Sequence, residues 1–185
     1  DALTHCIEAI LSPINDPPAE AVGIDGIEKI IKEESLIRAC EDGQDKEARW
    51  NMMMASTEGA MAFSKGLGAV HSMSHALGAN QELRLHHGTL NAVILPSVLR
   101  FNQNHVEDKY TRIARAMGNK VTTDLADEIE KLNEKIGMPA SLSEMDVTED
   151  MIPQLVAHAA NDPSNLTTPR LPSLEEWEKL FLEAL

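Results

Sequence analysis

The sequence predicts an all-α fold, a compact bundle of about nine helices in a single domain. Apolar residues recur with helical periodicity along nearly all of the 185 residues, and strand signals are nearly absent. Aromatic residues make up only 3%, so aliphatic residues and nine methionines must fill the core. That composition favours helices, because strands draw heavily on aromatic side chains.

Turn and capping residues divide the chain into helical segments. Pro13 ends a first helix, whose apolar stripe comprises Ala2, His5, Cys6, Ala9 and Ile10. Further helices are expected at about 19–31, 35–41, 45–63, 69–78, 87–101, 106–117, 122–136, 149–160 and 173–185. The segment 163–172 is expected to be a loop.

Three local features refine these helices. Asp45 has the character of an N-cap for the long helix that follows it. Small side chains in that helix would let another backbone approach closely; they are Ala55, Ser56, Gly59, Ala60 and Ala62. The methionines at 52–54 are interpreted as core residues, and Pro96 predicts a kink inside its helix.

Charge and cysteine content narrow the class of protein. A net charge of −14 without a basic stripe argues against binding to nucleic acid or to an anionic membrane surface. Cys6 and Cys40 lie in no paired-cysteine motif, and no signal peptide or membrane span is apparent, so a cytoplasmic protein is expected. The chain begins at Asp1 as if in mid-helix, which predicts a domain taken from a longer polypeptide.

The most informative feature is a set of metal-ligand residues at helical spacing. Asp1 and His5 are four residues apart, as are His71 and His75. Residues at this spacing lie about 40° apart around a helix and roughly 6 Å apart along it. His87 follows a loop and can approach the same point from another helix. One carboxylate with several imidazoles suits Fe²⁺, Zn²⁺ or Ni²⁺ better than Mg²⁺ or Ca²⁺.

Each piece of this pattern has an ordinary structural alternative. Two histidines four apart on a helix often only form hydrogen bonds, and the adjacent pair His86–His87 is uninformative alone. The joint pattern favours a metal site, because the glycines would allow the helices to converge; they are Gly66, Gly68, Gly78 and Gly88. His105 and His158 lack such partners and are expected at the surface or at helix ends.

The chain resembles the C-terminal helical domain of the iron-containing (group III) alcohol dehydrogenases. The matching segments are DALTHCIEAILS at 1–12, GLGAVHSMSHALGA at 66–79 and HHGTLNAVILPSVLRFN at 86–102, with a weaker match at 138–165. The resemblance covers essentially the whole chain. It implies a helical domain of the dehydroquinate synthase-like type.

The resemblance also implies roles for the histidines. Asp1, His5, His71 and His87 would hold the metal, Fe²⁺ or alternatively Zn²⁺. His75 would be the nearby catalytic residue that faces the nicotinamide and substrate and relays a proton. The loop before His87 looks about two residues longer than in other members. This leaves a choice between His86 and His87, which falls on His87 because the family ligand immediately precedes a glycine.

The activity implied is the NAD- or NADP-dependent interconversion of small alcohols with aldehydes or ketones, with the metal as Lewis acid. The chain contains no Gly-rich dinucleotide-binding turn. The cofactor would therefore be held mainly by an absent N-terminal domain, and 1–185 alone is expected to be inactive. The intact enzyme is expected to form a homo-oligomer.

Two other classes of function fit the histidine pattern. A metal-dependent hydrolase or Fe(II) oxygenase also uses carboxylate and imidazole ligands, although no HExxH-type glutamate accompanies the histidines. A helical scaffold module in which the histidines merely pack is the alternative without catalysis.

Overall fold

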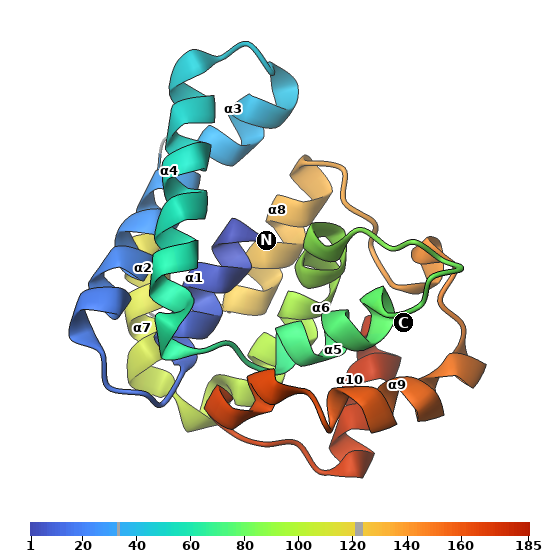
Figure 1. Ribbon diagram of the computed structural model, residues 1–185. Helices are drawn as coiled ribbons and strands as arrows, with labels where there is room; N and C mark the ends of the chain where they lie inside the picture. The colour runs from blue at the N-terminus through green and yellow to red at the C-terminus, as the bar shows by residue number, and fades with distance from the viewer. Residues whose placement is uncertain (33, 121–123) are drawn as a thin grey trace.

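The structure is a computed structural model that describes residues 1–32, 34–120 and 124–185. Over these residues the chain is all-α, with ten α-helices, five short 3₁₀ helices and no strand (Figure 1). The predicted fold class is confirmed. Each of the ten α-helices overlaps one of the helical segments predicted individually, so the overall figure of about nine was one too low. The residues that the structure describes include no helix long and apolar enough to cross a membrane.

The α-helices follow the predicted order closely. Their bounds are α1 Ala2–Leu11, α2 Pro17–Ile31, α3 Ser35–Glu41, α4 Lys46–Ala62, α5 Ala69–Gly78, α6 His87–Asn102, α7 Glu107–Ala116, α8 Leu125–Lys135, α9 Ile152–Ala159 and α10 Leu174–Ala184. The 3₁₀ helices are Phe63–Lys65, Gln103–His105, Ser143–Met145, Glu149–Met151 and Pro163–Thr167.

The departures from the expected bounds have local causes. Helix α2 begins at Pro17 rather than at 19, because proline is tolerated in the first turn and Asp16 accepts a hydrogen bond from Ala19 N at 3.2 Å. The first turn of the segment 149–160 is 3₁₀ rather than α-helical. The predicted start of α8 at Thr122 lies outside the described residues.

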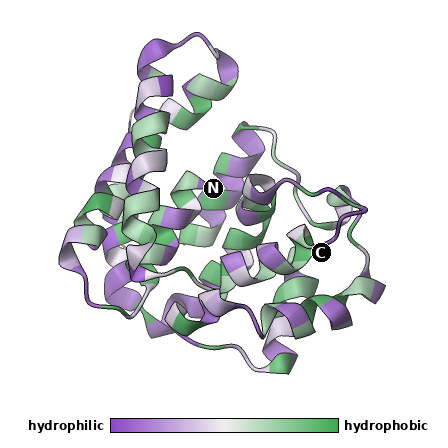
Figure 2. Cartoon of the chain, in the orientation of Figure 1, coloured by the Kyte–Doolittle hydropathy of each residue, from purple (hydrophilic) through white to green (hydrophobic). Residues whose placement is uncertain are grey.

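Helix α1 is the central helix of the fold. It packs against α2, α4, α6 and α7. Eight of the nine residues from Leu3 to Leu11 are buried, and His5 is the exception. The single apolar stripe expected for this helix is therefore too narrow, because neighbours cover α1 on several sides. Figure 2 shows apolar residues concentrated on the inner helices and hydrophilic residues along the outer loops.

The packing of α4 against α1 and α2 uses the predicted small residues only in part. Ala55, Gly59 and Ala62 are buried, whereas Ser56 and Ala60 are exposed. Met53 is also exposed, at 56%, so the interpretation of 52–54 as core residues is wrong for its middle member. The upper part of α4 projects with α3 beyond the other helices (Figure 1), and its side chains Trp50 and Met53 are exposed.

Both cysteines are free thiols in different surroundings. Cys6 is fully buried, and burial together with the nearby Glu58 carboxylate raises the pKa of its thiol to about 12. Cys40 is exposed on α3.

The close approach of α4 to α1 depends on Gly59. A Cβ at this position would lie 3.1 Å from both Ala2 O and His5 Cβ. Gly59→Val should therefore destabilise the fold by about 1–3 kcal/mol through overpacking. Urea unfolding measures the loss. Gly78→Ala is the control, since its added Cβ meets nothing within 4 Å, and an equal loss there would contradict the assignment.

Candidate metal centre

Three helix beginnings meet at the histidine cluster. Asp1 is the N-cap of α1, His71 lies in the first turn of α5, and His87 is the first residue of α6. Helix α5 packs against α6, and α1 also contacts α6. The residues gathered here are therefore up to 86 positions apart in the chain, and tertiary packing rather than local sequence brings them together.

The Asp1 carboxylate is the shared neighbour of three imidazoles. Its Oδ1 lies 3.6 Å from His87 Nε2 and 3.9 Å from His71 Nε2. Its Oδ2 lies 3.7 Å from His5 Nδ1. Two ligand atoms of a tetrahedral ion with bonds of about 2.1 Å stand about 3.4 Å apart. The observed separations are close to this value.

Three of these side chains form the tightest group. The candidate ligand atoms of Asp1, His5 and His71 all lie within 4.8 Å of one another. His87 approaches this group from the side of α6, with its ring centroid 5.2 Å from that of His71. The structure thus brings together all four residues that the sequence singled out as ligands.

Of the adjacent pair, only His87 faces the cluster. His86 is the exposed N-cap of α6, and its Nδ1 accepts a hydrogen bond from Thr89 N at 3.3 Å. This capping role occupies the His86 ring at the helix end, while one residue later His87 points at Asp1. Of the two adjacent histidines, His87 is therefore the one that lies beside Asp1.

His75 lies beside the cluster with a partner of its own. Its Nδ1 is 3.0 Å from Asp162 Oδ2, and its ring stacks on that of His87 with centroids 5.6 Å apart. The side chain is 41% exposed. Burial alone would raise the pKa of Asp162, but hydrogen bonds from Ser164 and His75 outweigh it and hold that pKa below its usual value.

The surroundings keep two of the candidate ligands neutral. Burial is the main cause that lowers the pKa of His5 to about 4, and the neighbouring His71 is the second cause. Burial and the nearby imidazoles of His71 and His75 lower the pKa of His87 to about 4 in the same way. Both rings are therefore unprotonated near pH 7, which is the form that can bind a metal ion.

Asn91 stands where the candidate ligand atoms converge. Its Nδ2 donates to Asp1 Oδ1 at 2.8 Å, and the same nitrogen is 3.1 Å from His87 Nε2 and 3.3 Å from His71 Nε2. The residue is fully buried, and its Oδ1 has no hydrogen-bond partner. A carboxylate oxygen and two imidazole nitrogens thus converge around one donor group. Such a concentration of acceptors suits a cation.

Sequence reasoning missed three residues that contact the histidines. Glu8 lies 2.5 Å from His71 Nδ1 and is the one carboxylate within the mostly apolar helix α1, which was a usable signal. Asn91 follows His87 by one helical turn, a weaker signal. Asp162 is 87 residues from His75, and nothing local to it indicated the contact.

Three of the four glycines lie at close approaches around the centre. A Cβ at Gly88 would be 3.3 Å from Asp1 Cβ, and one at Gly68 would be 2.9 Å from Glu8 Oε1. Gly66 has φ +92° and packs against Thr167. The expectation is wrong for Gly78, where nothing lies within 4 Å, because this residue ends α5 on its exposed side.

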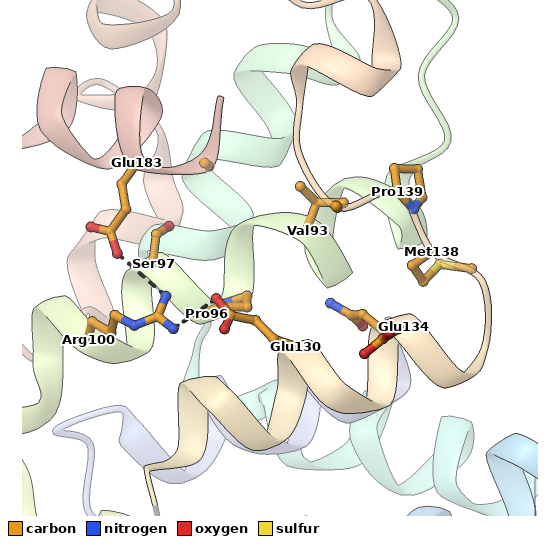
Figure 3. Close-up of a pocket in the computed structure, with 12 residues that line it drawn as sticks. Val93, Pro96, Ser97, Arg100, Glu130, Glu134, Met138, Pro139 and Glu183 are labelled. Carbon is orange, nitrogen blue, oxygen red and sulfur yellow. Dashed lines mark ion pairs between the residues drawn. The ribbon is translucent and has the colours of Figure 1, made fainter.

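The two remaining histidines and the pocket between α6, α8 and α10 lie outside the histidine cluster. His105 and His158 are exposed at helix ends, as expected. A pocket of about 460 Å³ between α6, α8 and α10 has apolar walls and carboxylates (Figure 3). Its Arg100 pairs with Glu130 at 2.8 Å and with Glu183 at 3.6 Å. The residues lining this pocket include no histidine.

Solved structures and curated sequences show what the fold and the cluster resemble. A crystal structure of 1,3-propanediol oxidoreductase superimposes with a TM-score of 0.93 at 33% identity, covering 100% of this chain and 50% of the other. The 4-hydroxybutyrate dehydrogenase of Cupriavidus necator is 42% identical over 192 residues, and the 1,3-propanediol dehydrogenase of Klebsiella pneumoniae is 34% identical over 193. These alignments cover 100% of this chain and 50% and 49% of the two relatives.

Residues 1–185 match the C-terminal part of the Fe-containing alcohol dehydrogenase family, and the chain belongs to that family. The resemblance drawn from the three sequence segments is thereby confirmed. The chain spans about half the length of the curated relatives it matches.

The histidines should differ sharply in chemical accessibility. In the chelator-treated chain, diethyl pyrocarbonate should modify the exposed His86 and His105 well before His71, which is 1% exposed and contacts Glu8 through Nδ1. Peptide mass spectrometry over a time course measures the rates. The urea-unfolded chain is the control, in which the three rates should converge. Equal rates in the folded chain would contradict the buried position of His71.

Proposed function

We propose that this chain is the metal-binding catalytic domain of an NAD(P)-dependent alcohol dehydrogenase, and that Asp1, His5, His71 and His87 hold one divalent ion. The observation that carries the proposal is the convergence of the Asp1 carboxylate and three imidazoles at separations of 3.6–3.9 Å. Two of these imidazoles are neutral near pH 7 because of their lowered pKa values.

The donor set fits iron, with zinc as the alternative. One carboxylate and three nitrogens suit a borderline divalent metal, whereas Mg²⁺ and Ca²⁺ require mainly oxygen ligands. The family is named for iron, which makes Fe²⁺ the first choice. When bound, the ion supplies Lewis-acid polarisation of an alcohol or carbonyl oxygen.

His75 is proposed as the catalytic residue next to the metal. Asp162 holds its Nδ1 at 3.0 Å, so Nε2 is the nitrogen left to transfer a proton. The ring is 41% exposed, which allows it to meet a substrate, a nicotinamide and solvent. An imidazole suits this task because its ordinary pKa lies near neutrality.

The redox cofactor would be held mainly outside this chain. A dinucleotide-binding turn is a Gly-rich turn that joins a strand to a helix. The described residues contain no strand, so they contain no turn of this kind. Because the chain spans about half of its relatives, we propose that 1–185 forms the C-terminal half of a two-domain enzyme whose N-terminal half binds NAD or NADP. A homo-oligomer remains our expectation for the intact enzyme, measurable by light scattering.

Small alcohols and aldehydes are the proposed substrates. Relatives are named for 4-hydroxybutyrate and 1,3-propanediol, so these two alcohols are the first to test. The experiment measures alcohol-dependent NADH or NADPH formation by the full-length gene product after loading with Fe²⁺ or Zn²⁺, together with its metal content. A protein that binds no metal, or oxidises no alcohol when loaded, would overturn the proposal.

The two histidines of α5 should separate metal binding from turnover. In the full-length protein, His71→Ala should lose both the metal and activity, because it removes a ligand. His75→Ala should keep most of the metal and lose turnover by about 10²–10⁴-fold, the range expected for a general acid–base group. Elemental analysis and steady-state kinetics measure the two effects. Equal metal loss in both variants would instead make His75 a ligand.

Residues 1–185 alone should fold without catalysing redox chemistry. Their helices bury a continuous apolar core, so a helical circular dichroism spectrum is expected. Hydride transfer requires a positioned nicotinamide, and the net charge of −14 discourages a pyrophosphate from binding without a dedicated site. If this fragment alone oxidised an alcohol with NAD(P) above background, the proposal that the cofactor is held mainly outside 1–185 would be wrong.

A further inference from the structure

Glu8 makes the shortest polar contact with the candidate ligands. Its Oε2 lies 2.5 Å from His71 Nδ1, on the side of the ring opposite to Nε2, which faces Asp1. Glu8 is 4% exposed and is the only acidic residue that is buried in the described part of the chain. A carboxylate in this position needs specific partners, because burying an unpaired charge is costly.

The second oxygen of Glu8 binds the beginning of α5. Glu8 Oε1 accepts a hydrogen bond from Val70 N at 2.8 Å. The N-cap of α5 is Gly68, which supplies no side-chain cap, so Glu8 provides the missing acceptor from α1. A Cβ at Gly68 would come within 2.9 Å of this oxygen, and the glycine therefore leaves room for the carboxylate.

The two contacts together determine which nitrogen of His71 carries the proton. An ionised carboxylate can only accept hydrogen bonds, so His71 Nδ1 must donate its hydrogen to Glu8. A neutral imidazole with a proton on Nδ1 has its lone pair on Nε2. Nε2 is the atom that lies 3.3 Å from Asn91 Nδ2 and 3.9 Å from Asp1 Oδ1.

We propose that Glu8 is a positioning residue that holds His71 in the tautomer with Nε2 open to the metal, an inference that rests on the proposed metal site. Glu8 also fixes the ring by linking it to the first turn of α5. A carboxylate behind a ligating histidine raises the basicity of the ring and commonly contributes 10–100-fold to metal affinity. The charges of Asp1 and Glu8 together match those of one divalent ion.

Glu8→Gln is the sharpest test because it preserves size. The amide oxygen can still accept from Val70 N, so α5 keeps its cap. The amide NH₂ then faces His71 Nδ1 and donates to it, which forces the ring proton to Nε2 and blocks the ligand atom. We expect this variant of the full chain to bind Zn²⁺ 10–100-fold more weakly in competition with a chromophoric chelator.

Asp162→Asn is the matched control. It makes the same carboxylate-to-amide change at the other His–carboxylate contact, 3.0 Å from His75 Nδ1. Because His75 is not among the proposed ligands, Zn²⁺ affinity should stay within about twofold of the unsubstituted chain. Circular dichroism and thermal unfolding of both metal-free variants show whether the helices are retained. Equal weakening by both substitutions would overturn the role of Glu8.

The tautomer itself can be observed without a metal or a variant. In the metal-free chain with ¹⁵N-labelled histidine, long-range ¹H–¹⁵N spectra should show His71 protonated on Nδ1, and in Glu8→Gln protonated on Nε2. A proton on Nε2 of His71 in the unsubstituted chain would overturn the inference even if Glu8→Gln failed to fold. Unchanged Zn²⁺ affinity in a folded Glu8→Gln protein would do the same.

The two proposals fail in different ways. If the unsubstituted chain binds no Zn²⁺, or binds it equally well after His71→Ala, the proposed metal site is wrong, and the tautomer spectrum still decides what Glu8 does. If the unsubstituted chain binds one Zn²⁺ through His71 and Glu8→Gln binds it equally well, the metal site stands and the role of Glu8 is wrong.

Discussion

The enclosure of α1 by its neighbours is the constraint on which the rest of the structure depends. This helix contacts α2, α4, α6 and α7, and its buried residues belong to the core. The same ten-residue helix and its N-cap carry Asp1, His5 and Glu8. Any shift of α1 would therefore disturb the core and the candidate metal centre together. A core packed at crystal-like density resists such shifts, and this holds Asp1, His5 and Glu8 at their positions in the candidate metal centre.

Most of the fold could be predicted from the sequence because its determinants are local. Apolar periodicity located the helices, and Asp45, whose side chain accepts from Ala48 N, marked the start of α4 as expected. The errors arose where tertiary packing decides. Periodicity could not show that α1 is covered on several sides, nor that α4 projects with α3 and leaves Met53 exposed. These outcomes depend on which helices meet.

The candidate site could be predicted to a similar extent. The ligand-type residues were apparent because each i,i+4 pair belongs to one helix or its N-cap. The structure brings Asp1, His5, His71 and His87 together and stacks His75 on His87. The groups that orient them were not apparent. Glu8 meets His71 across 63 residues, and Asp162 meets His75 across 87. Residues at such separations interact only after the helices have packed, so no spacing in the sequence records them.

His86 caps α6 and His87 faces Asp1, and these separate roles affect which changes in the preceding loop the site can tolerate. His86 closes the first turn of α6 through Thr89, so the helix itself determines that the next residue faces Asp1. The length of the preceding loop, residues 79–86, therefore does not determine the direction in which His87 points. An insertion or deletion in this loop would therefore leave the histidine at the start of α6 facing Asp1.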